Sequence, residues 1–177
     1  TGLAVARRHH RPVVQGSVTH LPFADTSVDL ATSFDVLYCL RDEDERMALR
    51  EMSRVLRPGG FALFNVAALD MLHGSHSALT MEVRRYTRAR LRTRLEAAGF
   101  QVARLTFTNF TTFPLTLAVR WSDRIRGQAK TASTADLHVP ATPINAALDL
   151  ALRLEAQMMR VADLPIGSSL LCLARRV

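Results

Sequence analysis

The chain has little cysteine, almost no lysine and no long apolar run. Its two cysteines, Cys39 and Cys172, stand far apart, which argues against a disulfide framework and predicts the free thiols of a cytoplasmic protein. No apolar run reaches the roughly 18 residues that a membrane-spanning helix needs, so we expect no membrane span. Residues 1–12 hold three arginines and no apolar segment, and therefore predict no signal peptide. Because the chain begins with Thr1 rather than methionine, we expect a piece of a longer product.

Because lysine is almost absent, the positive charge of the chain comes from arginine. Of 23 basic residues 22 are arginine, and the formal net charge is +7. The only dense basic stretch, residues 84–94, coincides with an expected helix that would have a solvent-exposed face. Proteins that bind nucleic acid gather basic residues on one surface, and we therefore do not expect nucleic acid as a partner. With 48% apolar and 22% charged residues, the 177-residue chain has the composition of a globular domain with its own core.

Turn residues and apolar periodicity divide the chain into short elements of alternating type. Apolar, β-rich runs between turn residues predict strands, and helical periods that end at proline or glycine predict helices. We expect strands at residues 11–16, 28–33, 61–67, 100–107 and 168–174. We expect helices at residues 1–10, 42–56, 87–98, 114–126 and 143–160. Asp42 and Thr87 are the expected N-caps of two of these helices.

This order of elements predicts an α/β protein. The last two strands suit an antiparallel hairpin, with a helical insertion at residues 108–167 before the final strand. We expect a single domain over residues 1–177.

Two motifs at a fixed spacing carry the most specific signal. The first joins Leu21-Pro22-Phe23 to the apolar strand of residues 28–33, and the second is Arg54-Val55-Leu56-Arg57-Pro58-Gly59-Gly60. In order and spacing they resemble the middle of a class I S-adenosylmethionine-dependent methyltransferase, and the resemblance extends over about residues 3–177. It implies a Rossmann-like methyltransferase sheet, N-terminally truncated, with a C-terminal antiparallel hairpin. It also implies S-adenosylmethionine as cofactor and methyl transfer to a small-molecule, glycan-linked or lipid-linked acceptor.

The expected cofactor contacts follow the ends of two strands, since ligands of open α/β sheets bind beyond the carboxyl ends of the strands. The resemblance implies that the turn Gly16-Ser17-Val18 lies beside the adenine. Ser17 stands where the family usually has an acidic residue. Ser33 and Phe34, at the end of the next strand, are the other expected cofactor contacts.

The expected acceptor and catalytic residues come from two later segments. Tyr38 either lines the acceptor pocket or packs as a half-buried aromatic. Arg85 and Tyr86 either bind an anionic or hydroxylated acceptor or are solvated residues at a helix start. His76 lies in the long connection of residues 68–83 and is the candidate proton acceptor, because an imidazole titrates near neutrality. We expect no metal site.

The family's glycine-rich loop, which receives the amino acid part of the cofactor, has no counterpart in the sequence. The acidic residue that binds the ribose hydroxyls is also absent. Without the strands that carry these features, the strand at 11–16 lacks its natural neighbours. It would pair with residues 28–33, be displaced from the sheet, or leave a gap that another chain or a missing N-terminal segment fills.

Two other readings remain open at this point. One is a non-catalytic, truncated scaffold or partner subunit that does not bind S-adenosylmethionine. The other is a different nucleotide-binding α/β enzyme, such as a dehydrogenase, although the motif of residues 54–60 does not belong to that pattern.

Overall fold

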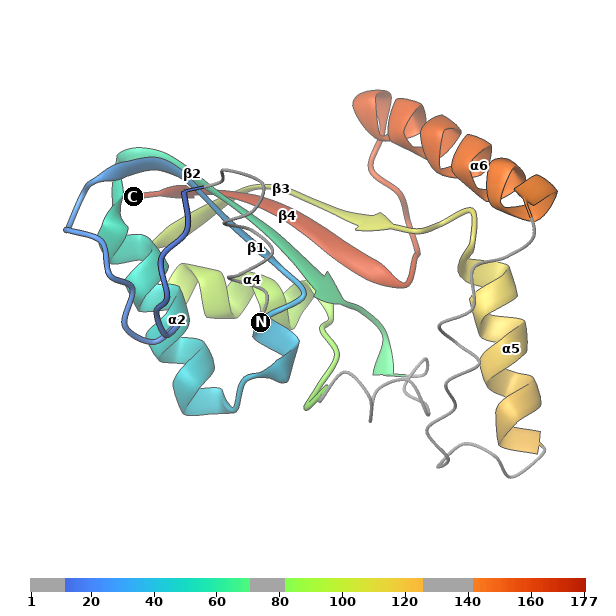
Figure 1. Ribbon diagram of the computed structural model, residues 1–177, viewed down its shortest axis with the longest axis horizontal. Coiled ribbons are helices and arrows are strands. Elements are labelled where there is room, and N and C mark those ends of the chain that lie inside the picture. Colours follow the sequence, from blue (N-terminus) through green and yellow to red (C-terminus); the bar gives the residue numbers. More distant parts are fainter. Residues whose placement is uncertain (1–11, 71–81, 126–141) are drawn as a thin grey trace.

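The computed structural model describes residues 12–70, 82–125 and 142–177, which form one mixed sheet with helices at one face and one end (Figure 1). The strands are β1 (Val28–Phe34), β2 (Leu56–Ala67), β3 (Phe100–Thr108) and β4 (Ser169–Arg176). The helices are a 3-10 turn η1 (Leu37–Cys39), α2 (Asp42–Val55), α4 (Arg88–Ala97), α5 (Phe113–Ile125) and α6 (Thr142–Val161).

The four strands are arranged in the order β1-β2-β4-β3. β1 and β2 are parallel, with Thr32 beside Leu63, whereas β4 runs antiparallel to both β2 and β3. The parallel pair is joined through α2, as a crossover connection requires. The structure therefore confirms the α/β class and the antiparallel hairpin at the C-terminal end of the chain. In the sequence, the helices α5 and α6 come between the two paired strands of that hairpin, β3 and β4.

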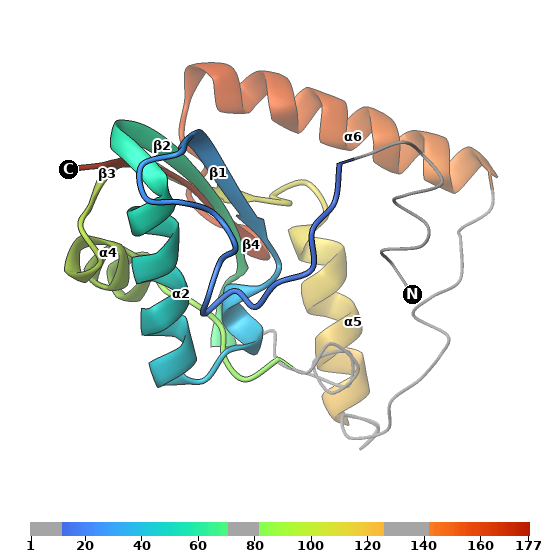
Figure 2. The same cartoon turned by 60° about the vertical axis from the view of Figure 1, so that its left-hand side comes forward.

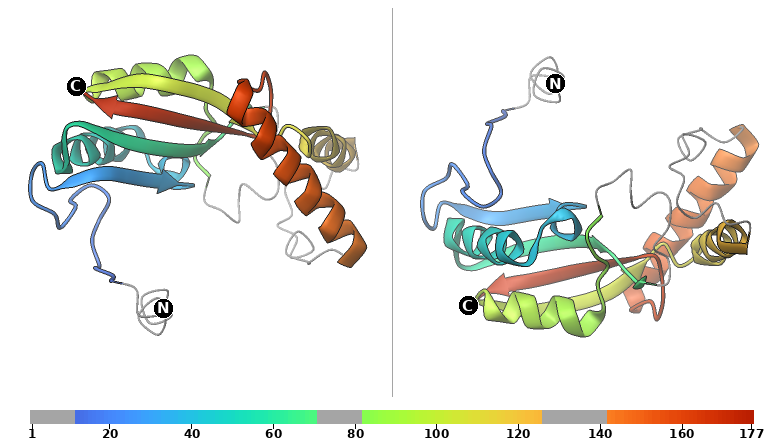
Figure 3. Two further views of the ribbon diagram at one scale, coloured as in Figure 1. Left: turned by 90° about the horizontal axis from the view of Figure 1, so that it is seen from above. Right: turned by 90° about the horizontal axis from the view of Figure 1, so that it is seen from below.

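The core lies between the sheet and the helices α2 and α4, which cover one of its faces (Figures 1 and 3). Alternate residues of β2 and β4 point into it, as the pleat of a strand dictates. These buried residues are Ala62, Phe64, Val66, Leu170, Cys172 and Ala174. Phe64 packs edge to face against Phe100, with 5.8 Å between the ring centroids. On the opposite face of the sheet, Leu30, Phe34 and Phe61 are exposed.

The two helices of the core begin for different reasons. The first turn of α2 contains four acidic residues, 42–45, which the positive end of the helix dipole favours. Asp42 is the first residue of α2 rather than its N-cap, so that prediction is wrong: Arg41 holds the cap position and no side chain caps it. Thr87 is confirmed as the N-cap of α4, because its hydroxyl accepts a hydrogen bond from Arg90 N at 3.2 Å.

The strand expected at residues 11–16 is a further error. Residues 12–16 form no strand, and the nearest β pairing is an isolated bridge between Ser17 and His20. The physical reason is that β structure needs a partner, and β1 has only β2 beside it in the described sheet. Of the three outcomes expected for this segment, the structure has it displaced from the sheet. The domain limits at 1–177 and 108–167 stay predictions.

Candidate functional site

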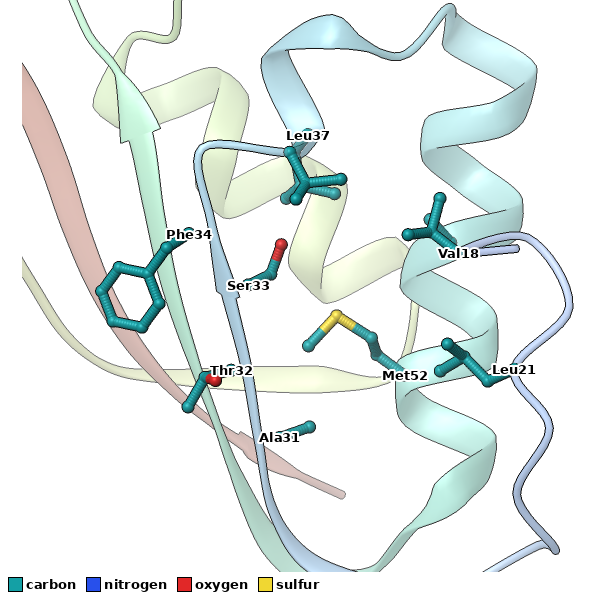
Figure 4. A pocket seen from close by; sticks show the side chains of 10 residues that line it. Val18, Leu21, Ala31, Thr32, Ser33, Phe34, Leu37 and Met52 are labelled. Carbon is teal, nitrogen blue, oxygen red and sulfur yellow. The ribbon is translucent and has the colours of Figure 1, made fainter. Parts of the chain in front are cut away.

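A cavity of about 340 Å³ lies between the second half of β1, the helix α2 and the loop that precedes β1 (Figure 4). This volume is within the range of small-molecule sites. Its lining is mostly apolar and consists of Val18, Leu21, Ala31, Thr32, Ser33, Phe34, Val36, Leu37, Ala48 and Met52. The cavity therefore lies at the carboxyl end of β1, where a ligand of an open α/β sheet is expected.

Ser33 supplies the polar group that faces α2 in this cavity. Its side chain points from β1 into the space between Leu37 and Met52, and the residue is 8% exposed (Figure 4). The hydroxyl makes no hydrogen bond to any described residue, so it is available to a ligand. Thr32 and Phe34 alternate with Ser33 along the strand and turn to the other side of β1. Phe34 lines the rim of the cavity as an exposed ring.

The predicted adenine turn meets the cavity through one residue only. Val18 lines the cavity, whereas Gly16 and Ser17 do not. The Ser17 hydroxyl instead contacts the Thr19 hydroxyl at 2.8 Å, and the Ser17 carbonyl accepts from His20 N at 3.1 Å. Gly16 lies so close to Pro22 that a Cβ atom would come within 2.7 Å of its ring. Glycine is therefore required here by the proline of the following motif.

A partly buried contact between the two sequence motifs holds this loop against α2. Arg54, from the second motif, donates hydrogen bonds to the carbonyls of Leu21 at 3.1 Å and Phe23 at 2.9 Å, both in the first motif. Glu51 accepts from Leu21 N at 2.8 Å and from Arg54 Nε at 2.7 Å. The guanidinium of Arg54, with help from Leu21 N–H, lowers the pKa of Glu51 to about 2. We did not predict Glu51 as a site residue, although the occurrence of the two motifs together was a signal for such a contact.

The residues expected to bind the acceptor lie in a neighbouring but separate region. Tyr38 is half-buried, and its carbonyl accepts from Val83 N at 2.9 Å. Burial, followed by the charge of Asp35, raises the pKa of the Tyr38 phenol. Arg85 is held by Glu82 in a nearly buried ion pair, with 2.6 Å between Nε and Oε1, and also donates to the Ala68 carbonyl. The guanidinium of Arg85 thus already has protein partners.

Tyr86 belongs to the core rather than to an open pocket. It is fully buried, and its hydroxyl donates to Glu45 Oε1 at 2.7 Å. Burial, reinforced by this hydrogen bond, raises the pKa of Tyr86. Arg84 completes the cluster through Glu45 Oε2 at 2.9 Å and a contact to Asp42. Neither the acceptor role nor the solvated alternative fits Tyr86, because its side chain is enclosed and its hydroxyl is already bonded within the core.

The remaining expectations concern the proton acceptor and a metal site. His76 falls in residues 71–81, outside the described residues. Across the described ranges, no three histidine, cysteine or acidic side chains gather as metal ligands would. None of the helices in those ranges has the length and apolar character needed to cross a bilayer.

Comparison with known proteins agrees with this geometry. Residues 1–64 match the family described as "Methyltransferase domain". The chain is 38% identical over 76 residues to a malonyl-[acyl-carrier protein] O-methyltransferase of Coxiella burnetii, covering 43% of this chain and 26% of that protein. It is 46% identical over 59 residues to a demethylmenaquinone methyltransferase of Corynebacterium efficiens, covering 33% and 24%. The matched part is thus about a quarter of the length of these relatives.

Among solved structures, an S-adenosylmethionine-dependent methyltransferase of Thermotoga maritima, described as a possible histamine N-methyltransferase, resembles the whole fold. Its TM-score is 0.56 at 16% identity, over 98% of this chain and 68% of that one. The sheet order and this solved structure agree in showing a methyltransferase-like fold, and the sequence match to the methyltransferase family lies within residues 1–64.

Proposed function

We propose that this chain takes part in S-adenosylmethionine-dependent methyl transfer, with the cavity beside Ser33 as the place that receives the adenosyl part of the cofactor. The observation that carries the proposal is the unpartnered Ser33 hydroxyl within an apolar cavity at the carboxyl end of β1. A flat heterocycle matches such a site, because it offers apolar faces to the walls and polar edges to a single hydroxyl.

The described residues fit one part of the cofactor. Val18, Leu37 and Met52 offer apolar contact to a ring, and Ser33 offers one hydrogen bond. The lining of the cavity contains no charged side chain, so the described residues do not supply the partners of the amino acid part. The lining of the cavity therefore fits the adenine ring of the cofactor and the atoms next to it.

When bound, S-adenosylmethionine supplies a methyl group made electrophilic by its sulfonium. The chain's own residues position the cofactor and enclose its ring. The Glu51–Arg54 pair fixes the loop that carries Val18 and Leu21 against α2, so that the wall of the cavity is formed before a ligand arrives. The apolar lining keeps water from the bound ring. His76 stays the proposed proton acceptor, and Tyr38 and Arg85 the proposed neighbours of the acceptor.

The acceptor class is inferred from the relatives. Their names specify a malonyl group on an acyl-carrier protein and demethylmenaquinone. We propose a small-molecule or a glycan- or lipid-linked acceptor for this chain. A cytoplasmic location is part of the proposal, supported by two cysteines that form no disulfide in the described part of the chain.

A calorimetric titration of the chain with S-adenosylhomocysteine tests the cofactor site. We expect binding, and we expect Ser33→Ala to weaken it by roughly two- to tenfold, the worth of one hydrogen bond. Ser53→Ala is the matched control, because it removes a hydroxyl from α2 at a position that does not line the cavity. We expect Ser53→Ala to leave the affinity unchanged.

The same titration separates the proposal from the non-catalytic alternative. If the wild-type chain takes up no S-adenosylhomocysteine, the scaffold reading is favoured for this chain. Equal losses in Ser33→Ala and Ser53→Ala would contradict the assignment of the ligand to this cavity.

A further inference from the structure

The turn that follows β1 contains a residue in an unusual backbone conformation. Asp35 comes directly after the last residue of β1 and has a φ of +58°. This is the left-handed region, which residues with a Cβ atom adopt at a cost in energy. Such strain persists only where surrounding contacts hold it, and it gathers at functional sites. The surroundings of Asp35 must therefore supply contacts that hold its backbone.

These contacts come from the end of the neighbouring strand. β1 and β2 are parallel, so their carboxyl ends lie at the same end of the sheet, where the chain turns from β1 into η1 (Figure 2). The Asn65 carbonyl on β2 accepts a hydrogen bond from Asp35 N at 3.1 Å, and the Asn65 side-chain amide donates to Asp35 Oδ1 at 3.1 Å. Asp35 is exposed and lies outside the core, so this clasp of Asp35 and Asn65, rather than side-chain packing, fixes the turn.

The neighbours of Asp35 on both sides belong to the cavity. Residues 33–34 precede it and residues 36–37 follow it, and all four line the cavity, whereas Asp35 and Asn65 do not. The Ser33 hydroxyl points toward the space that Leu37 borders (Figure 4). Because the backbone angles of Asp35 set the direction in which the chain continues, a change there would carry residues 36–37 away from Ser33. The clasp therefore controls how the two halves of this wall face each other.

We propose that Asp35 and Asn65 are positioning residues of the cavity, which hold the turn after β1 in the conformation that receives the cofactor. This inference rests on the proposed function, because it assigns to both residues an effect on cofactor affinity. Neither side chain lines the cavity, so each acts through the residues on either side of Asp35. A wall that reaches its binding conformation only part of the time lowers the apparent affinity in proportion to that fraction.

Three substitutions of Asp35 separate the backbone from the side chain in a calorimetric titration with S-adenosylhomocysteine. Asp35→Ala loses the acceptor and tolerates positive φ poorly, so the Kd should rise roughly tenfold. Asp35→Gly lacks the acceptor but adopts positive φ freely, and the rise should be only about threefold. Asp35→Asn keeps both an acceptor and the tolerance of positive φ, and its Kd should stay within about twofold of the wild type. Loss of charge alone does not produce this order, because the asparagine variant also lacks the charge.

Asn65→Ala tests the other half of the clasp. It removes the amide donor, and the Kd should rise roughly three- to fivefold. Combining it with Asp35→Ala should add little to the effect of Asp35→Ala, because both substitutions break the same contact. Asp29→Ala is the matched control. It breaks an exposed pair between the same two strands, with 2.6 Å between Arg57 Nη1 and Asp29 Oδ1, at the end of β1 away from the turn, and it should leave the Kd unchanged.

Two measurements without ligand separate positioning from a general effect on the sheet. Exchange of the Asp35 amide hydrogen, which is bonded to the Asn65 carbonyl, should accelerate by roughly tenfold in Asn65→Ala and stay unchanged in Asp29→Ala. The midpoints of urea denaturation of these two variants should agree, since each variant loses one exposed contact between β1 and β2.

The wild-type titration decides the proposed function, and the variants decide the clasp. Absence of binding by the wild-type chain would overturn both. If the wild-type chain binds, the positioning role alone fails when Asp29→Ala weakens binding as much as Asn65→Ala, or when Asp35→Asn weakens it as much as Asp35→Ala. Unchanged exchange of the Asp35 amide in Asn65→Ala would remove the clasp whether or not a ligand binds.

Discussion

At the scale of single residues, Glu45 is the clearest case of a polar group that the core needs. Its carboxylate is fully buried, yet it has the Tyr86 hydroxyl on one oxygen and Arg84 on the other. Arg90 and Arg94 lie within 3.7 Å of the same carboxylate. A buried charge is tolerated only when it is paired in this way. Three of the six arginines between 84 and 94, namely Arg84, Arg90 and Arg94, are thus engaged with the acidic start of α2.

We predict that Glu45→Gln lowers the free energy of unfolding by about 2–3 kcal/mol, because it removes the charge that the buried Tyr86 and Arg84 share. Urea denaturation measures the change. Glu43→Gln is the control on the same helix, where an exposed carboxylate pairs with Arg46, and it should cost less than about 0.5 kcal/mol. Similar losses in the two variants would contradict the role of Glu45.

At the scale of elements, the long insertion between β3 and β4 is tied to the sheet by few contacts. Glu155 on α6 binds the backbone of Asn109 and Thr111, which precede α5. It also accepts from the Thr111 hydroxyl at 2.9 Å. Arg104 on β3 adds hydrogen bonds to the end of α6 through the carbonyls of Met159 and Ala162. One carboxylate thus joins both ends of the insertion.

We predict that Glu155→Ala loosens this junction and costs about 2 kcal/mol of stability, because three donors lose a charged acceptor. Hydrogen exchange of residues 109–112 should accelerate, whereas the exchange of β2 should stay unchanged. Gln157→Ala, an exposed position on the same helix, is the matched control. Unaltered protection at residues 109–112 in Glu155→Ala would show that the junction does not depend on this carboxylate.

At the scale of the whole molecule, the described sheet is covered on one face and open on the other. α2 and α4 form the covered face, and Leu30, Phe34 and Phe61 lie exposed on the other. The outer edge of β1 pairs with no described strand. An open edge beside exposed apolar side chains is a site where a further chain segment or another molecule can pair.

The stability of the whole chain should depend on pH through its paired carboxylates. Arg54 lowers the pKa of Glu51 from 4.5 to about 2, and Arg84 lowers the pKa of Asp42. Because the folded pKa lies below the unfolded one, this stabilisation is complete above about pH 4.5 and is lost as the pH falls toward 2. We predict that Glu51→Gln flattens the fall of unfolding free energy between these limits, as measured by urea denaturation at several pH values. Asp44→Asn, exposed on the same helix, should leave the curve unchanged, and an equally steep curve in Glu51→Gln would refute the prediction.

The local pattern of the sequence was enough for the elements with a clear period. The helices at 42–55 and 88–97 and the strands β1, β3 and β4 appear within a few residues of their predicted limits, because side-chain spacing and turn residues act within one element. β2 begins at Leu56, five residues before its predicted start at 61, so residues 58–60 belong to the strand rather than to a turn before it. The ends of strands also indicated part of the candidate site, since Val18, Ser33 and Phe34 line one cavity.

The sequence by itself determined the class of the fold, the order of its elements and, through two spaced motifs, the methyltransferase family that residues 1–64 resemble. Only the tertiary structure decided which distant residues meet. It brought Arg54 to the Leu21 carbonyl and the buried Tyr86 hydroxyl to Glu45, and it left residues 12–16 outside the sheet. The physical reason is that strand pairing and buried ion pairs need a partner from another part of the chain, and a local pattern does not specify that partner.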